Sequence, residues 1–106
     1  MTPEGGLVKA CLAYLKIRGI FAWRNNTGSF QGFGKGGVRR PVRVGIVGGG
    51  DIFGVLPGGR FLSIECKTAK GKTSLDQEAF MNEVNDQGGL ARVVRSIEEL
   101  EGIINE

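Results

Sequence analysis

The 106-residue sequence contains no histidine. This absence excludes Ser-His-Asp and Cys-His nucleophiles, histidine-ligated zinc and an imidazole general base. The sequence has only two cysteines, far apart, which is too few for a zinc site made of four cysteines. If the protein is a hydrolase, its catalytic site must therefore use carboxylates, lysine and a hard metal ion.

Cys11 and Cys66 both lie in apolar stretches, which predicts reduced, buried thiols rather than a disulfide. No apolar run approaches the roughly 20 residues of a membrane span, and the first residues do not resemble a signal peptide. We therefore expect a cytoplasmic protein without membrane association. With 41% hydrophobic residues, residues 1–106 are expected to form one domain with one core.

Acidic residues are scarce in the first two thirds of the chain. Residues 1–72 hold twelve Lys and Arg residues against Glu4, Asp51 and Glu65, whereas residues 73–106 hold two against eight acids. The acidic end is typical of solvated helices. A basic surface suited to a polyanion is the simplest account of the first part.

Short local signals predict a helix and a strand at the start of the chain. Thr2 can cap a helix that Pro3 begins, and apolar residues at helical spacing extend it to about Gly19. A strand is expected at Ile20–Asn25. The glycine-rich segment Thr27–Gly37 is interpreted as a flexible loop or a wide hairpin tip.

The rest of the chain has a sharper pattern, which predicts a mixed β-sheet flanked by helices. The predicted elements are a short strand at 42–47, strands at 51–57 and 60–67 joined by a turn at Gly58-Gly59, a helix at 74–87, a strand at 90–95 and a last short helix capped by Ser96.

Glu65 and Lys67 stand at the end of an apolar strand and project from one face, while Cys66 projects from the other. A hairpin that turns at Gly58-Gly59 pairs residues whose numbers sum to about 117, which puts Asp51 at the same end of the hairpin. Two carboxylates and an ammonium group there are typical of a site for Mg²⁺ or Mn²⁺. The alternative is a structural Glu–Lys ion pair, and the triplet Glu-Cys-Lys alone favours that alternative.

The wider arrangement is more specific than the triplet. "GGGDIFGVLPGGRFLSIECKTAKGKTSLDQEAF" (48–80) combines an aspartate, an apolar strand, a glycine turn, a second apolar strand ending in Glu-x-Lys, and a helix with a glutamine. It resembles the PD-(D/E)XK nuclease superfamily and, more closely, the stand-alone phage-type members of its virus-type replication-repair nuclease (VRR-NUC) group. "WRNNTG" (23–28) and "GGLARVVRSIEEL" (88–100) extend the resemblance over nearly the whole chain.

The resemblance implies a restriction-endonuclease-like α/β fold and a Mg²⁺- or Mn²⁺-dependent deoxyribonuclease. It also implies a role in DNA repair in a bacterial or phage-infected cell, no nucleotide cofactor, and duplex or branched DNA such as a four-way junction as the substrate. A homodimer is expected as well, because burial is modest at this chain length and a dimer would bury more apolar surface. The metal carboxylates of the family fall on Asp51 and Glu65, with the backbone carbonyl of Cys66 as a further ligand. The catalytic lysine falls on Lys67, and the supporting residues fall on Gln77 and Glu4.

One of these positions departs from the family, and others also suit a purely structural role. Gly50 stands where the family has proline, and glycine would leave the chain looser before the metal ligand. Ser74 and Gln77 also form the pattern of a capping box, and Glu4 is also a favourable first-turn acid. "GKTS" (71–74) fails as a phosphate-binding loop because Cys66 stands where the leading glycine is needed.

The basic candidates for contacts with a DNA backbone are Arg24, Lys35, Arg39, Arg40, Arg43, Lys70 and Lys72. Trp23, Phe30 and Phe33 could stack on bases, although the strand pattern favours a core position for Trp23. Two other functions remain open. One is a non-catalytic DNA-binding module of the same fold, and the other is a protein-interaction domain that uses the acidic C-terminal helices.

Overall fold

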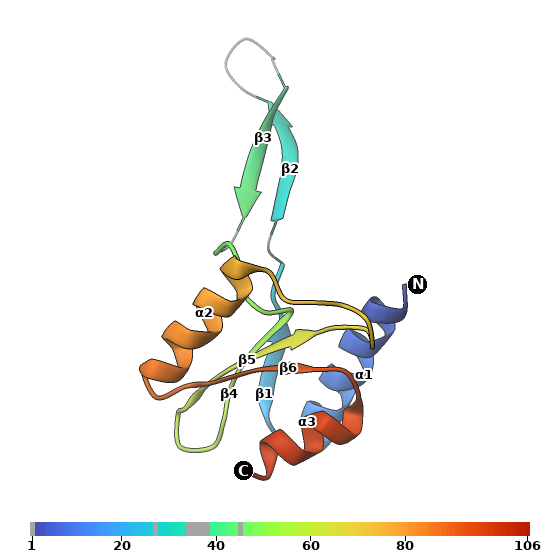
Figure 1. The fold of residues 1–106 in the computed structure, drawn as a ribbon, viewed down its shortest axis with the longest axis vertical. Coiled ribbons are helices and arrows are strands. Elements are labelled where there is room, and N and C mark those ends of the chain that lie inside the picture. Colours follow the sequence, from blue (N-terminus) through green and yellow to red (C-terminus); the bar gives the residue numbers. More distant parts are fainter. Residues whose placement is uncertain (1, 27, 34–38, 45) are drawn as a thin grey trace.

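The computed structural model describes residues 2–26, 28–33, 39–44 and 46–106, with the backbone alone at 28–33 and 39–44. The elements follow one another in the order α1 (Pro3–Ile17), β1 (Phe21–Arg24), β2 (Gly28–Phe33), β3 (Arg39–Val44), β4 (Ile52–Val55), β5 (Phe61–Cys66), α2 (Leu75–Asp86), β6 (Leu90–Val94) and α3 (Ile97–Ile104). Figure 1 shows their arrangement.

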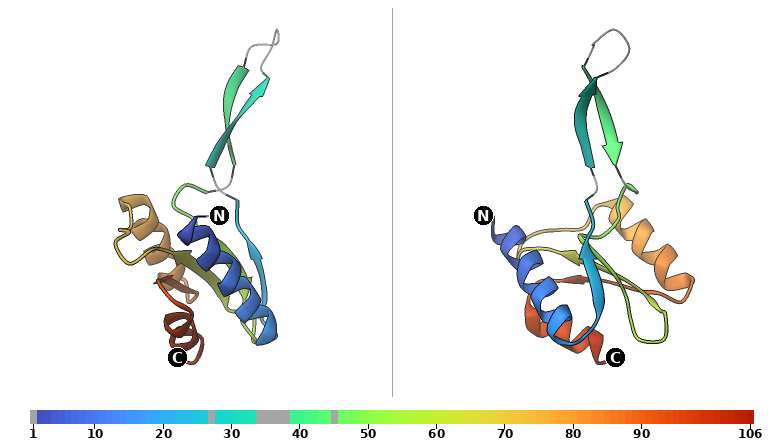
Figure 2. Two further views of the ribbon diagram at one scale, coloured as in Figure 1. Left: turned by 90° about the vertical axis from the view of Figure 1, so that its right-hand side faces the viewer. Right: turned by 180° about the vertical axis from the view of Figure 1, so that it is seen from behind.

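Strands β1, β4, β5 and β6 form a mixed sheet in the order β1-β4-β5-β6. β1, β4 and β5 pair antiparallel, and β6 runs parallel to β5. β2 and β3 pair only with each other, as a hairpin that projects from the sheet between β1 and β4 (Figures 1 and 2). The expected mixed α/β fold is therefore confirmed.

The hydrophobic core lies on the face of the sheet that α1 and α3 cover. Its members include Val8, Cys11 and Leu15 from α1, and Leu100 from α3. Every second residue of the strands reaches this face, and the strand residues of this core are Ile52, Leu62, Ile64, Cys66, Leu90 and Val94. The other face carries α2, in which no residue is buried. The two faces are thus covered to different degrees.

Helix α1 begins where the sequence predicts, because Thr2 accepts a hydrogen bond from Gly5 N at 3.0 Å and Pro3 occupies the first turn. Cys11 and Cys66 are free and fully buried, as expected. Their thiols contact each other across α1 and β5. The hydrogen bond to Cys11 and the burial both raise the pKa of the Cys66 thiol.

The β4–β5 hairpin is confirmed, but the expected register is wrong by one residue. Ile52 pairs with Ile64, and Leu56 N donates to Arg60 O at 2.8 Å. The turn therefore encloses three residues, Pro57 to Gly59, instead of the two glycines alone. Both glycines have φ +92°, a conformation that suits glycine. The shift does not change which face each side chain occupies on β5.

The glycine-rich segment belongs to a hairpin, but its residues Gly28–Phe33 form a strand of that hairpin instead of a loop or tip. Gly28–Phe33 pairs antiparallel with Arg39–Val44, so the second strand also lies earlier than the expected 42–47. Main-chain hydrogen bonds form the ladder, so the segment can pair without the alternation of apolar side chains that sequence analysis relies on. Residues 34–38 lie outside the described residues.

The remaining boundaries agree with the sequence to within one or two residues. Ser74 and Ser96 cap α2 and α3 by accepting hydrogen bonds from Gln77 N and Glu99 N, each at 3.1 Å. Within the described residues, no helix has both the length and the apolar character needed to cross a membrane.

Gly50 lies where the chain passes close to β5. A Cβ atom at this position would lie 2.5 Å from Ser63 Oγ and 2.9 Å from Ile64 O, and Gly50 itself is buried. The lack of a side chain at Gly50 therefore permits a close approach to β5. This role differs from the looseness that the sequence suggested, and a proline here would meet the same atoms.

We predict that Gly50→Ala lowers the free energy of unfolding by about 1–3 kcal/mol, because Ser63 and the β5 backbone must shift to admit a methyl group. Gly102→Ala is the matched control, since nothing in the described part of the chain lies within 4 Å of a Cβ atom there and α3 should gain up to about 1 kcal/mol from alanine. Denaturant unfolding of both variants measures the two effects. Equal stability of Gly50→Ala and the original protein would contradict the close approach.

Candidate metal centre

Three carboxylates from separate parts of the chain meet at one end of the sheet. Glu4 comes from the first turn of α1, Asp51 directly precedes β4, and Glu65 lies near the end of β5. One oxygen of each carboxylate lies within 4.8 Å of the other two. Glu4 and Asp51 are half-buried, whereas Glu65 is 4% exposed. The sequence predicted all three as site residues, and the structure brings them together.

The Glu65 carboxylate has one paired and one unpaired oxygen. Oε1 accepts a hydrogen bond from Gln77 Nε2 at 3.0 Å and lies 3.5 Å from Lys67 Nζ. Oε2 is buried and has no hydrogen-bond partner among the described residues. A buried charged oxygen without a partner is costly, and a bound cation is one group that would compensate it.

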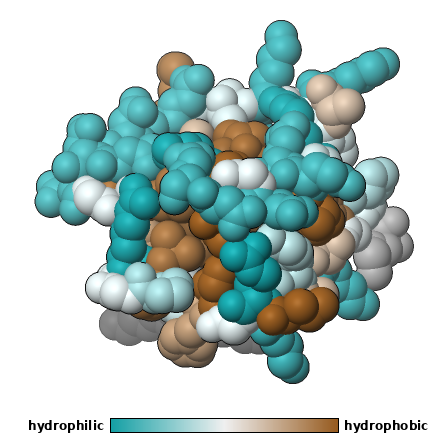
Figure 3. All heavy atoms as spheres, turned by 90° about the horizontal axis from the view of Figure 1, so that it is seen from below, coloured by the Kyte–Doolittle hydropathy of each residue, from teal (hydrophilic) through white to brown (hydrophobic). Residues whose placement is uncertain are grey.

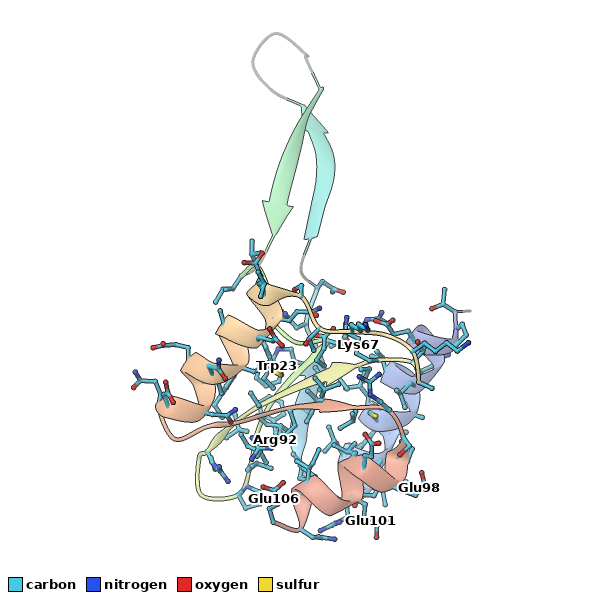
Figure 4. All side chains as sticks on the ribbon, in the orientation of Figure 1. Trp23, Lys67, Arg92, Glu98, Glu101 and Glu106 are labelled. Atoms are coloured by element: carbon cyan, nitrogen blue, oxygen red, sulfur yellow. The ribbon has the colours of Figure 1, made fainter. Side chains whose placement is uncertain are left out.

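Burial, together with the negative charge of Asp51, raises the pKa of the Glu65 carboxyl to about 7. The ammonium group of Lys67 acts in the opposite direction but less strongly, and Glu4 adds a smaller repulsion. Lys67 lies in the loop after β5 (Figure 4), and its side chain is 13% exposed. The cluster thus holds more negative charge than its own lysine neutralises.

Asp51 is held by the strand next to it. Its Oδ2 atom accepts a hydrogen bond from Cys66 N at 2.8 Å, so the carboxylate bridges from the start of β4 to the end of β5. This bond places the backbone of Cys66 beside the carboxylates. The assignment of the Cys66 carbonyl as a further metal ligand stays a prediction.

Gln77 serves two purposes at once. Its Oε1 atom accepts from Ser74 N at 2.9 Å, which completes the capping box of α2, while Nε2 donates to Glu65. The two interpretations of this residue are therefore compatible. The N-terminal end of α2 is tied to the site through one side chain.

Asn25 is a site residue that the sequence analysis did not single out. Its backbone N–H donates to Asp51 O at 2.8 Å, and its Nδ2 donates to Gly50 O at 3.0 Å. One residue thus fixes the carbonyl groups of both Gly50 and Asp51. The signal in the sequence was the pair of polar residues directly after β1, but its partners lie far along the chain.

Arg95 organises the loop that carries the basic residues after Lys67. Its guanidinium group donates to the carbonyls of Thr68 and Gly71, the latter at 2.8 Å. Lys70 and Lys72 are exposed on this loop. Arg95 was also missed by sequence reasoning, because nothing local links it to a loop more than twenty residues earlier.

The other predicted DNA contacts are only partly described. Arg24 is exposed at the end of β1. Arg39, Arg40 and Arg43 belong to β3, where the structure describes no side chains, and Lys35 lies outside the described residues. Phe30 and Phe33 belong to β2 and share that limit.

The expectation that Trp23 lies in the core is wrong. Its side chain is 42% exposed, on the edge strand of the sheet and on the face opposite the core. The alternation within β1 indicated an apolar face, but it could not indicate whether another element covers that face.

No family model matches this chain, and no curated protein sequence matches it. The chemistry of the site must therefore be argued from its own residues. Three carboxylates supply hard oxygen donors, and one of their oxygens is buried without a partner among the described residues, so the cluster could hold a metal ion.

The ion-free protein should lose stability as the pH rises. The folded-state pKa of Glu65, about 7, lies above its ordinary value of 4.5, so folding favours the protonated form. The stabilising contribution is complete below pH 4.5 and is lost as the pH rises through 7, with a full effect of about 3 kcal/mol.

We predict that Glu65→Gln removes this loss. In chelator, the variant should gain about 3 kcal/mol relative to the original protein between pH 4 and pH 8, as measured by denaturant unfolding. The comparison isolates Glu65 because the other acids titrate in both proteins. Parallel pH profiles for the two proteins would show that Glu65 ionises normally.

Asn25→Ala should weaken Mn²⁺ binding by about tenfold, because the Gly50 carbonyl loses the hydrogen bond from Asn25 Nδ2 and the backbone directly before Asp51 is held less firmly. Isothermal titration with Mn²⁺ measures the change. Asn26→Ala, one residue further on and exposed, is the control and should leave the affinity unchanged. Equal Mn²⁺ affinities for both variants would remove Asn25 from the site.

Proposed function

We propose that this protein is a metal-dependent deoxyribonuclease of the PD-(D/E)XK type. The observation that carries the proposal is the convergence of Glu4, Asp51 and Glu65 within 4.8 Å, with Glu65 Oε2 buried and unpaired among the described residues. Lys67 stands 3.5 Å from the same carboxylate, where an ammonium group can also face a substrate phosphate. The combination fits phosphodiester hydrolysis.

Asp51 and Glu65 would hold the cation, with Glu4 beside them and the Cys66 carbonyl as a further candidate ligand. A bound Mg²⁺ or Mn²⁺ lowers the pKa of a coordinated water and draws electron density from the phosphorus. The contribution of the chain is orientation. Cys66 N–H fixes the Asp51 carboxylate, and Gln77 fixes Glu65.

Lys67 supplies positive charge where negative charge develops on the phosphate, or orients the attacking water. In the hydrolysis, a water oxygen bonds to phosphorus while the bond from phosphorus to a deoxyribose oxygen breaks. The attacking water releases one proton and the leaving oxygen takes up one, so that one water is consumed. Lys67 lies close enough to the carboxylates to act on the same phosphate.

DNA is the proposed substrate because basic residues predominate in the part of the chain that carries the site. Arg24, Lys70 and Lys72 are exposed and fit contacts with phosphates. The VRR-NUC resemblance suggests the finer proposal of branched DNA, such as a four-way junction, as the substrate in bacterial or phage-infected cells. A homodimer, proposed because a chain of this length buries little apolar surface alone, would place two sites symmetrically for paired cuts.

A non-catalytic DNA-binding module is the alternative. It would keep the basic residues but would have no use for three carboxylates brought together beside a strand end. Acidic side chains there repel a polyanion and raise the cost of burying Glu65. The acidic cluster therefore favours catalysis over binding alone.

We predict Mg²⁺- or Mn²⁺-dependent cleavage when the protein is incubated with labelled duplex, flap, single-stranded and junction DNA. Asp51→Asn keeps the shape of the side chain but removes a charged ligand, and should lower the cleavage rate by about 100-fold or more. Lys67→Met keeps the aliphatic stem and should lower it by roughly 100-fold. Gel analysis of single-turnover reactions gives the rates.

Asp76→Asn is the matched control, because Asp76 is an exposed carboxylate of α2 outside the cluster, and its rate should be unchanged. Cleavage that persists in chelator, or an Asp51→Asn variant as fast as the Asp76→Asn variant, would refute the proposal. Salt-sensitive binding of DNA without cleavage under any metal condition would identify the binding module instead.

A further inference from the structure

A groove follows the outer edge of the sheet, between α1 and β1. β1 is the first strand of the sheet, and in the described part of the chain it pairs only with β4, so its other edge is open. The lining of the groove includes Lys16 of α1 and Phe21, Trp23 and Arg24 of β1. No aspartate or glutamate of the described chain lines it. We refer to this groove as the edge groove.

The edge groove has an aromatic side and a basic side. Arg24 pairs with Ile52 of the core, so it lies on the side of the sheet that α1 covers, and Lys16 belongs to α1 itself. Phe21 and Trp23 alternate with Arg24 along the strand and therefore lie on the other side. Side chains from both faces of an edge strand border its open edge, which is why one groove contacts both sets.

Both rings of the aromatic side are accessible. Phe21 is 71% exposed and Trp23 is 42% exposed. Their ring centroids are 5.1 Å apart, but the planes are inclined by 49°, so the two rings do not stack flat on each other. Uncovered aromatic rings suit the bases of a single nucleic-acid strand, because every base has a flat π face.

The basic side is available for phosphates. Lys16 and Arg24 are exposed, and neither takes part in the ion pairs that the described residues form. A single strand has its bases on one side and its charged backbone on the other, and proteins that bind it combine stacking rings with a positively charged groove. The edge groove presents the same two features on its two sides.

One end of the edge groove lies at the candidate metal centre. Arg24 pairs with Ile52, the residue after Asp51, and Asn25 N donates to Asp51 O at 2.8 Å. Phe21 lies three residues back along β1, which is about 10 Å at the rise of a strand. A strand of DNA held in the groove would therefore lead directly to the carboxylates.

The acidic helix α2 does not oppose a polyanion in the edge groove. α2 contacts β5 and β6, and β4 lies between β5 and β1. Two strand spacings separate β1 from β5, which amounts to about 10 Å. Salt at physiological concentration screens exposed charges over about that distance.

An open strand edge also allows an extended peptide to add as a further strand. β1 has only four residues, which makes it a short template for such a ladder. A peptide strand pairs through backbone groups and does not require exposed rings on one side and cations on the other. The side chains of the edge groove therefore favour a nucleic acid over a peptide.

A hollow at the end of the molecule opposite the hairpin is a weaker candidate. Figure 3 shows apolar side chains in the middle of that end with hydrophilic ones around and between them. The lining of the hollow includes Arg18 and Arg60 but no aromatic residue. Arg18 donates to Asn105 Oδ1 at 3.1 Å and Arg60 donates to Gly88 O at 2.9 Å, so both guanidinium groups already have partners within the chain.

We propose that the edge groove holds a single DNA strand and guides it to the metal centre, with bases against Phe21 and Trp23 and phosphates against Lys16 and Arg24. The preferred substrate then has a single-stranded segment next to the cut. This substrate preference rests on the proposed nuclease function, whereas the binding of a single strand in the groove does not.

Trp23, labelled in Figure 4, is the only tryptophan in the sequence, so its fluorescence reports on the edge groove. Titration of the full chain with a hexathymidylate oligonucleotide in chelator should quench the Trp23 emission. Phe21→Ala keeps the reporter and should weaken binding at least about fivefold, because one stacking ring is lost. Ile17→Ala, at an 84% exposed apolar residue outside the groove, is the matched control and should change the affinity less than about twofold.

The salt dependence of the same titration tests the basic side. Each contact with a phosphate of a single strand adds about 0.7 to the slope of log affinity against log salt concentration. The double variant Lys16→Gln/Arg24→Gln should therefore reduce the slope by about 1.4. Arg18→Gln/Arg60→Gln removes the same charge from the hollow at the other end and should leave the slope unchanged.

Cleavage with Mn²⁺ connects the groove to the substrate. At limiting protein concentration, Phe21→Ala should lower the rate at least about fivefold on a duplex with a single-stranded tail. The same variant should change the rate on a blunt duplex less than about twofold.

The inference is overturned by a Trp23 emission that does not respond to the oligonucleotide, by equal effects of Phe21→Ala and Ile17→Ala, or by equal losses on tailed and blunt duplexes. Each of these results would leave metal-dependent cleavage intact. Quenching without cleavage under any metal condition would refute the nuclease and keep the edge groove as a single-strand site. An emission that changes with protein concentration, and not with DNA, would also overturn the inference and assign the edge to another protein strand.

Discussion

A carboxylate buried at the end of the central strand is the constraint on which this arrangement depends. Glu65 is 4% exposed and close to two other acids, so its ionised form is held at a cost. Gln77 and Lys67 compensate Oε1, while Oε2 has no partner in the part of the chain that the structure describes. A strand that needed only stability would carry an apolar residue here. Because Glu65 Oε2 lacks this partner, a cation bound at this end of the sheet would stabilise the carboxylate.

The two faces of the sheet have different roles. The face covered by α1 and α3 holds the core, and the contact between the Cys11 and Cys66 thiols lies within it. The opposite face carries Glu65 and the exposed aromatic residues Phe21 and Trp23. Alternation along each strand connects these faces, so that stable packing on one side sets the positions of reactive and exposed groups on the other.

Local signals in the sequence predicted much of the fold, because caps and turns depend on neighbouring residues. Ser74 and Ser96 begin helices, and the β4–β5 hairpin turns near its glycines. The position of the hairpin turn already placed Asp51 near Glu65, whereas the addition of Glu4 to this pair was available only through a family resemblance. The strands of the β2–β3 hairpin were missed because they lack a regular alternation of apolar side chains. The exposure of Trp23 was misjudged because a strand pattern does not show which face another element covers. The bonds of Asn25 were missed because their partners lie far along the chain.

Strands β1 and β4 are neighbours in the sheet although the hairpin β2–β3 stands between them in the chain. The contact from Asn25 N to Asp51 O, at 2.8 Å, closes the ladder where the chain leaves and re-enters it. The β2–β3 hairpin, the arm of the molecule, is therefore an insertion between two strands that already pair with each other. Changes in its length carry a small entropic cost. The length of this arm can therefore change while the acidic cluster at its base keeps its geometry.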